Sequence, residues 1–200
     1  MRDSPDHHDD VNEVLTQFIR GLAPLARQSG HQAWMHPVTG SVPDLPAEPK
    51  PDVQATLTAL AHRPLRPERQ PINLHHLRLT NADLDGANLT GAHLHGANLT
   101  GAHLHGANLT DASLDGADLT RAHIHGADLT GAYLTGAWLT VANLTVANLT
   151  VANLARANLT RANLIGEDLT GALLGPNPPG VPPGWVITDS ITGELRRATT

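Results

Sequence analysis

The sequence contains no cysteine and few aromatic residues, and each shortage excludes a class of structure or chemistry. Without cysteine, the chain cannot form a disulfide, a thiolate zinc site or a cysteine nucleophile. Aromatic residues make up 2% of the 200 residues, so we do not expect an ordinary core built around rings.

Basic residues and long apolar runs are also scarce. The 13 Lys and Arg are outnumbered by 19 Asp and Glu, which gives a net charge of −6. Direct nucleic-acid binding is not expected, because it depends on clustered basic residues. No apolar run approaches the roughly 18 residues of a membrane span, and residues 1–10 are polar and acidic, unlike a signal peptide. These features predict a soluble cytoplasmic protein without a membrane span.

What the sequence does contain is a repeat of five residues. Residues 72–176 divide without a gap into 21 blocks, of which Ala87-Asn88-Leu89-Thr90-Gly91 is typical. The central residue is Leu in every block except at Ile124, and Ala stands two residues before it from Ala82 to Ala162. Asn, Asp or His usually precedes the centre, and Gly is common at the end of the block.

A period of five fits neither a helix nor a strand over long distances. It fits a short extended piece that points Ala and Leu to the same side, followed by a corner in which Gly tolerates positive φ. A single block buries too little apolar surface to be stable, so stacked neighbours must complete the core. The repeat therefore predicts an all-β solenoid with Ala and Leu inside.

The tandem pattern A-[DN]-L-x-x resembles the pentapeptide-repeat family. The resemblance implies a right-handed quadrilateral β-helix with four pentapeptides in each coil, hence about five coils in residues 72–176. One block departs from the pattern, since Glu167 stands at the inward Ala position. Because an unpaired buried carboxylate is costly, we expect a frayed last coil or an outward-turned Glu167.

The flanks predict a cap at each end of the solenoid. Residues 1–71 contain two helical patterns, over 11–22 and 52–60, separated by a Pro-rich linker, and the second is expected to cover the first coil. Residues 177–200 are expected to form a Pro/Gly linker followed by a small hairpin or a tail. Parts of residues 2–20 and 51–55 resemble the segment that precedes the repeats in actinobacterial pentapeptide proteins. Many of those have membrane helices upstream, and membrane attachment is not inferred for this chain.

Histidines form the first candidate site. With 20 residues per coil, His103 and His105 should stack on His123 and His125, at about 5 Å from one coil to the next. Four imidazoles that close could chelate zinc, nickel or copper. The alternative is a solvated ladder that arose by tandem duplication of a ten-residue unit.

Apolar residues on the outside form the second candidate site. Tyr133 and Trp138 should point outward, and Val141, Val146 and Val151 replace the usual polar or Gly corner residue. Exposed apolar clusters often mark contact surfaces, so these five residues are the predicted partner-binding surface. The alternative is drift at a tolerant corner position.

No arrangement typical of an enzyme is present, so neither catalysis nor a cofactor is predicted. The main hypothesis is a non-catalytic scaffold that binds an unknown protein partner, as a monomer or a homodimer. The family resemblance adds DNA gyrase as an alternative partner, because quinolone-resistance members mimic B-DNA. Residues 72–176 carry eight acidic and four basic residues, a net charge of −4, well short of the one charge per about 1.7 Å of duplex DNA.

Overall fold

The coordinates are a computed structural model that describes residues 17–19, 21, 48–62, 71–175, 185–189 and 194–197. Most of the Pro-rich linker predicted between the two helical patterns, and the Pro/Gly linker after residue 176, lie outside these ranges. Among the described residues, no helix is both long enough and apolar enough to span a membrane.

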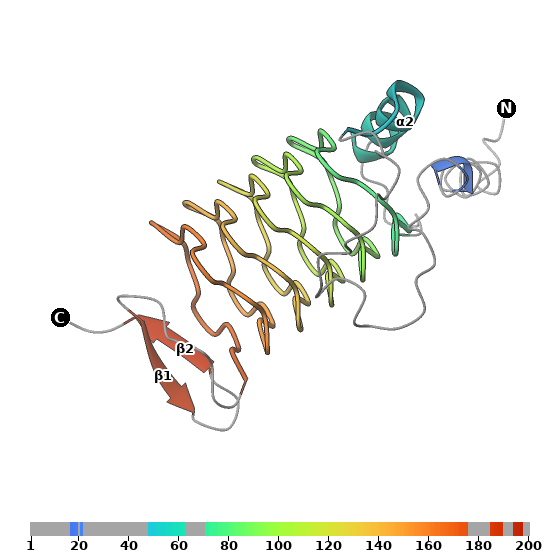
Figure 1. The fold of residues 1–200 in the computed structure, drawn as a ribbon. Helices are drawn as coiled ribbons and strands as arrows, with labels where there is room; N and C mark the ends of the chain where they lie inside the picture. Colours follow the sequence, from blue (N-terminus) through green and yellow to red (C-terminus); the bar gives the residue numbers. More distant parts are fainter. Residues whose placement is uncertain are drawn as a thin grey trace, which may run out of the picture.

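Residues 71–175 form a solenoid in which each residue lies over the one 20 positions later (Figure 1). Parallel bridges recur every five residues, from Asn73 with His93 to Asn153 with Leu173. Backbone hydrogen bonds join successive coils, such as the one from the His93 N–H to the Ile72 carbonyl at 2.8 Å. Each pentapeptide therefore forms one side of a four-sided coil.

The corners between sides are tight turns with one left-handed residue. In a typical corner, the Ala92 N–H donates to the Leu89 carbonyl at 2.9 Å, and Gly91 between them has a φ of 64°. A positive φ at the third residue of a β-turn is the geometry of type II turns. The same backbone occurs where the corner residue is not Gly, and Val141, Val146 and Val151 have φ values of 61°, 51° and 51°.

The interior is packed with the Ala and Leu of the repeat. From Ala82 to Leu154, every inward Ala and every central residue is at most 1% exposed. Packing loosens in the last coil, where Leu159, Ala162 and Leu164 are only partly buried. This agrees with the expectation of a frayed last coil. Glu167 is 4% exposed, so the other expectation, an outward-turned side chain, is wrong.

Helix α2 (Pro51–Ala61) lies at the first coil (Figure 1). Its side chains Val53, Leu57 and Leu60 are 1–2% exposed and belong to the same apolar cluster as the repeat. The Gln54 amide also bonds the backbone of Asp83, donating to its carbonyl at 2.7 Å and accepting from its N–H at 3.0 Å. Apolar packing and a paired amide thus fix α2 on the solenoid.

Strands β1 (Trp185–Asp189) and β2 (Glu194–Arg197) form an antiparallel hairpin at the other end. The Leu195 N–H donates to the Ala172 carbonyl, and the Leu195 carbonyl accepts from the Gly171 N–H, both at 2.9 Å. Leu195 is 1% exposed, so the hairpin joins the last coil through both backbone hydrogen bonds and apolar burial.

Candidate interaction surface

The four sides of the solenoid present four columns of side chains, each with one residue per coil. Because every central Leu points inward, the residue before it is the one that faces outward in the middle of a side. Side 1 carries residues 73, 93, 113, 133, 153 and 173; side 2 carries 78, 98, 118, 138 and 158; side 3 carries 83, 103, 123, 143 and 163; side 4 carries 88, 108, 128, 148 and 168.

Asn and Asp dominate these columns for a structural reason. Their side-chain oxygen accepts a hydrogen bond from the backbone N–H two residues on, as Asp118 Oδ1 does from Thr120 at 3.0 Å. This bond satisfies an N–H at the start of a corner, where the ladder between coils is interrupted. It recurs, at 2.9–3.3 Å, at Asp83, Asn88, Asn98, Asn108, Asp118, Asp128, Asn143, Asn148, Asn153, Asn158, Asn163 and Asp168.

In two corners the residue before the central Leu is not Asn or Asp, and the backbone N–H there donates to an Asp of the preceding coil instead. The His105 N–H donates to Asp85 Oδ1 at 2.8 Å, and the Thr135 N–H donates to Asp115 Oδ1 at 3.1 Å. These two aspartates therefore bond the backbone of the next coil, a role that the sequence pattern alone did not indicate.

The predicted metal-ligand histidines form two separate stacks. The rings of His103 and His123 lie 5.0 Å apart in the middle of side 3, and those of His105 and His125 lie 3.7 Å apart at the following corner. The His105 Nδ1–H donates to the His125 carbonyl at 2.9 Å. Within residues 71–175 and the other described ranges, no group of three or more His, Asp or Glu could hold a metal ion. The described residues therefore give no support to a metal site at these four histidines.

The structure spreads the five predicted partner-binding residues around the coil. Tyr133, 51% exposed, lies on side 1, and Trp138 lies half-buried on side 2. Val141, Val146 and Val151 are 41–60% exposed but occupy three successive corners. Because each side is five residues long, consecutive blocks face in different directions. These five residues therefore do not form one continuous patch.

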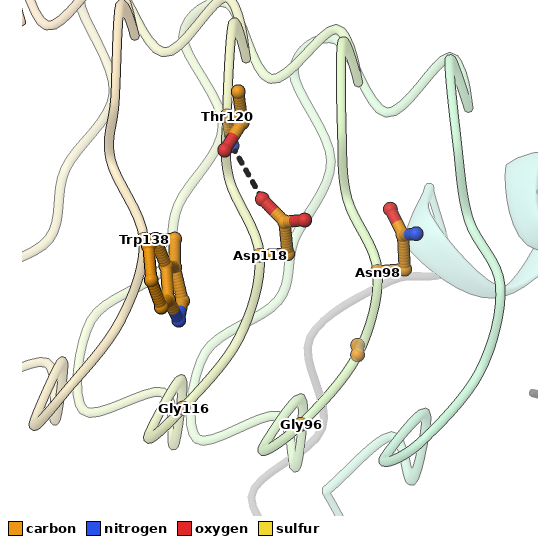
Figure 2. Close-up of a pocket in the computed structure, with 7 residues that line it drawn as sticks. Gly96, Asn98, Gly116, Asp118, Thr120 and Trp138 are labelled. Carbon is orange, nitrogen blue, oxygen red and sulfur yellow. Dashed lines mark hydrogen bonds between the residues drawn. The ribbon is translucent and has the colours of Figure 1, made fainter. Parts of the chain in front are cut away.

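A shallow groove lies instead on side 2, beside Trp138 (Figure 2). Asn98, Asp118 and Trp138 follow one another in the same column, one coil apart. Gly96 and Gly116 form the corner on one edge of the groove, and Thr120 lies at the other edge. Trp138 is one of the predicted partner-binding residues, whereas Asn98 and Asp118 are not, although both lie at multiples of 20 residues before it.

The groove exists because a large ring follows small neighbours. Trp138 stands where Asn98, Asp118 and Asn158 occur in other coils of this column, and its indole is much larger than their side chains (Figure 2). At Gly116, a Cβ would meet no atom within 4 Å, which means that the corner beside the ring is open. Side 2 therefore presents an aromatic ring, a carboxylate and an amide around an open space.

Comparison with known proteins places the repeat in a family. The model of the family described as pentapeptide repeats matches residues 72–106, 97–136 and 137–175, which together cover just over half of the chain. No curated protein matches the sequence significantly.

Several solved structures are similar to this chain. One is HetL, a pentapeptide repeat protein involved in regulating heterocyst differentiation in Nostoc sp. strain PCC 7120, with 32% identity, 55% of this chain and 67% of HetL covered, and a TM-score of 0.36. Another is QnrB1, a plasmid-mediated fluoroquinolone resistance protein, with 23% identity, 52% of this chain and 60% of QnrB1 covered, and a TM-score of 0.34. A third is a pentapeptide repeat protein of the Arabidopsis thaliana thylakoid lumen, with 33% identity, 55% and 66% covered, and a TM-score of 0.17.

The family resemblance noted in the sequence is confirmed by the match to the family model. Members of this family form right-handed quadrilateral β-helices and are generally structural or interaction proteins. The chain belongs to the pentapeptide repeat family.

Proposed function

We propose that this protein is a non-catalytic β-helical scaffold that binds another protein through the outside of its solenoid. In the proposed architecture, a right-handed helix of about five coils is capped by α2. The packed interior is the observation that carries the proposal, since inward residues from Ala82 to Leu154 are at most 1% exposed. Such an interior leaves no room for a substrate, and the polar side chains lie on flat, repeating sides.

A DNA-mimicking protein that binds gyrase is the alternative suggested by the family resemblance. The distribution of carboxylates favours the scaffold. By column, Asp83 lies on side 3, Asp118 on side 2 and Asp128 on side 4, while Asp111 and Asp115 lie at two different corners. A mimic of duplex DNA needs a continuous acidic stripe, and acids dispersed around the coil do not supply one.

Photo-crosslinking from one coil tests the proposal. Benzoylphenylalanine would replace, one at a time, His93, Asn98, His103 and Asn108, which occupy the four sides of the same coil. Tyr133 and Trp138 show that a large ring fits at this position. In the native cells, we expect a discrete protein adduct from one side and none from the opposite side. Equal adducts from all four sides, or no adduct from any, would contradict the scaffold proposal.

A supercoiling assay tests the alternative, that the protein mimics DNA and binds gyrase. We expect purified full-length protein to leave DNA gyrase activity unchanged, with or without a fluoroquinolone. Inhibition or drug protection at low micromolar concentration would favour DNA mimicry instead. Homodimer formation and a cytoplasmic location stay predictions, and light scattering of the full chain would settle the first.

A further inference from the structure

Two of the side chains that line the groove on side 2, Trp138 and Asp118, attract cations. The face of an indole ring is the negative part of its quadrupole and attracts cations. Asp118 stands one coil from Trp138 in the same column, at a spacing of about 4.8 Å. Both Trp138 and Asp118 line the groove (Figure 2), so a ligand beside the ring also meets the carboxylate.

The carboxylate of Asp118 can accept a further hydrogen bond. Its Oδ1 accepts the Thr120 N–H at 3.0 Å, which holds the side chain in place. Its Oδ2 has no hydrogen bond to any of the described residues. A carboxylate can accept several hydrogen bonds, so one oxygen can anchor the backbone while the other receives a donor from a partner.

The charged groups around the groove are of both signs. Asp115 lies at the corner next to Gly116, and its Oδ1 already accepts the Thr135 N–H. Arg121 lies beyond Thr120 at the opposite corner, and Arg78 lies two coils from Asp118 in the same column. At the Gly116 edge, Asp115 is acidic and the space beside Gly116 is open, while the same corner also carries the His76 ring next to Gly96 and Arg156 two coils after Gly116. The Thr120 edge carries Arg121 directly, so a cation would enter over Gly116.

We propose that this groove binds an arginine side chain of a partner protein, with the guanidinium stacked on Trp138 and hydrogen-bonded to Asp118. A guanidinium is planar, so it can lie on an indole and donate to a carboxylate at the same time, which a lysine ammonium does less well. The open corner at Gly116 gives the chain of the arginine its path. This inference rests on the proposed scaffold function and names the chemistry of the partner.

Titration with a triarginine peptide tests the groove directly. The full-length protein would be observed by NMR through the indole N–H of Trp138, assigned by its loss in Trp138→Phe, since the chain has three Trp. We expect a saturable shift of this signal with triarginine and none with tricitrulline, which has the same shape without the charge. A Trp138 signal that moves equally with both peptides, or with neither, would overturn the proposal.

Matched substitutions separate the groove from general charge effects. Asp118→Asn keeps the turn bond, because the Asn98 oxygen accepts the Thr100 N–H in the same way at 3.0 Å, and should weaken triarginine binding by about threefold. Asp128→Asn is the control: Asp128 makes the same bond, to Thr130 at 3.0 Å, but lies on side 4 between Asn108 and Asn148. Equal weakening by the two variants would show that only net charge matters.

A second pair of variants changes the shape without changing the charge. Gly116→Asn should narrow the groove, and the left-handed corner accepts Asn, as Asn81 shows with a φ of 54°. Gly106→Asn is the control, since a Cβ there also meets nothing within 4 Å, but on a different corner. We expect weaker triarginine binding in the first variant and unchanged binding in the second. Unchanged binding in both would place the peptide elsewhere.

The peptide titration and the crosslinking can fail independently. An adduct obtained only from the His93, His103 or Asn108 position would support the scaffold and contradict the groove. Triarginine binding without any adduct from the four sides would support the groove chemistry and contradict the scaffold function.

Discussion

The corners of the earlier coils differ from those of the later coils in sequence but not in backbone. From residue 86 to residue 136, most left-handed corner residues are Gly, with φ values of 62–68°. From residue 141 to residue 161 they are Val or Arg, with φ values of 51–61°. Left-handed φ is unfavourable for a β-branched residue such as Val. The buried Ala and Leu, together with the bonds between coils, therefore impose the corner on whatever residue stands there.

The comparison also separates structural from functional positions. If the core and the backbone ladder fix the coil, outward positions can vary without loss of the fold. Trp138 is such a variation, in a column whose other residues are Arg78, Asn98, Asp118 and Asn158. Residues that depart from the repeat on the outside are accordingly the best candidates for binding.

The largest expected loss of stability comes from a substitution in the core, on which the earlier and the later coils both depend. Leu109→Ala removes a fully buried side chain and should lower the free energy of unfolding by about 2–5 kcal/mol. Leu164→Ala, in the partly buried last coil, should cost less than half as much. Urea denaturation followed by circular dichroism measures both, and equal losses would mean that the last coil is packed as tightly as the rest.

A valine placed at a Gly corner of an early coil should also lower the folding stability, by somewhat less than the core substitution. Gly106 has a φ of 62° and open space at its Cβ position, so Gly106→Val adds backbone strain without a clash. We expect a loss of about 1–2 kcal/mol of folding stability. A thermal melt that does not change would show that left-handed valine is tolerated without cost in this fold.

The turn bonds of the two regions should differ in importance. The Asn148 oxygen accepts from both the N–H and the hydroxyl of Thr150, and its amide donates to Thr130 at 2.8 Å. Asn148→Ala should therefore cost about 1 kcal/mol or more. Asn88 also accepts from both the N–H and the hydroxyl of Thr90, but its bond to the N–H is longer, at 3.3 Å. Among the described residues its amide makes no bond like that of Asn148 to Thr130, so Asn88→Ala, before the Gly91 corner, should cost less. A larger loss at Asn88 than at Asn148 in chemical denaturation would reverse this ranking.

The smallest expected effect is a gain. Val146→Gly relieves the strained φ of 51° but raises the entropy of the unfolded chain. The two terms nearly offset, and we expect a net stabilisation of about 0.5 kcal/mol. A fall in melting temperature would mean that contacts of the valine side chain with the neighbouring coil outweigh the strain.

Much of the fold could be predicted from the sequence, because the inward residues hardly vary. Ala and Leu at fixed spacing identify the buried side, and the family pattern supplies four pentapeptides per coil. At Glu167, the expected loosening of the last coil agrees with the partial burial of Leu159 and Leu164, whereas the alternative of an outward-turned side chain is wrong. A rule about single carboxylates takes no account of the surroundings that keep this one buried.

The site was harder to predict than the fold. Apolar residues close in sequence, such as Val141, Val146 and Val151, were grouped although a side of five residues sends them to different corners. The groove can be recognised only from the register of 20 residues, which places Asp118 one coil and Asn98 two coils before Trp138 in the same column. The stacking of the histidines followed from the same register, but the split between a side and a corner depended on the turn geometry.

The central claim is that core and ladder, rather than corner residues, impose the coil. Its most direct test is the backbone torsion at the valine corners in solution, from NMR scalar couplings and the intensity of the intraresidue amide-to-Hα contact. The account predicts positive φ at Val141, Val146 and Val151, near the 51–61° found here. Negative φ at these three residues would contradict it, and would mean that the later coils turn their corners differently from the earlier ones.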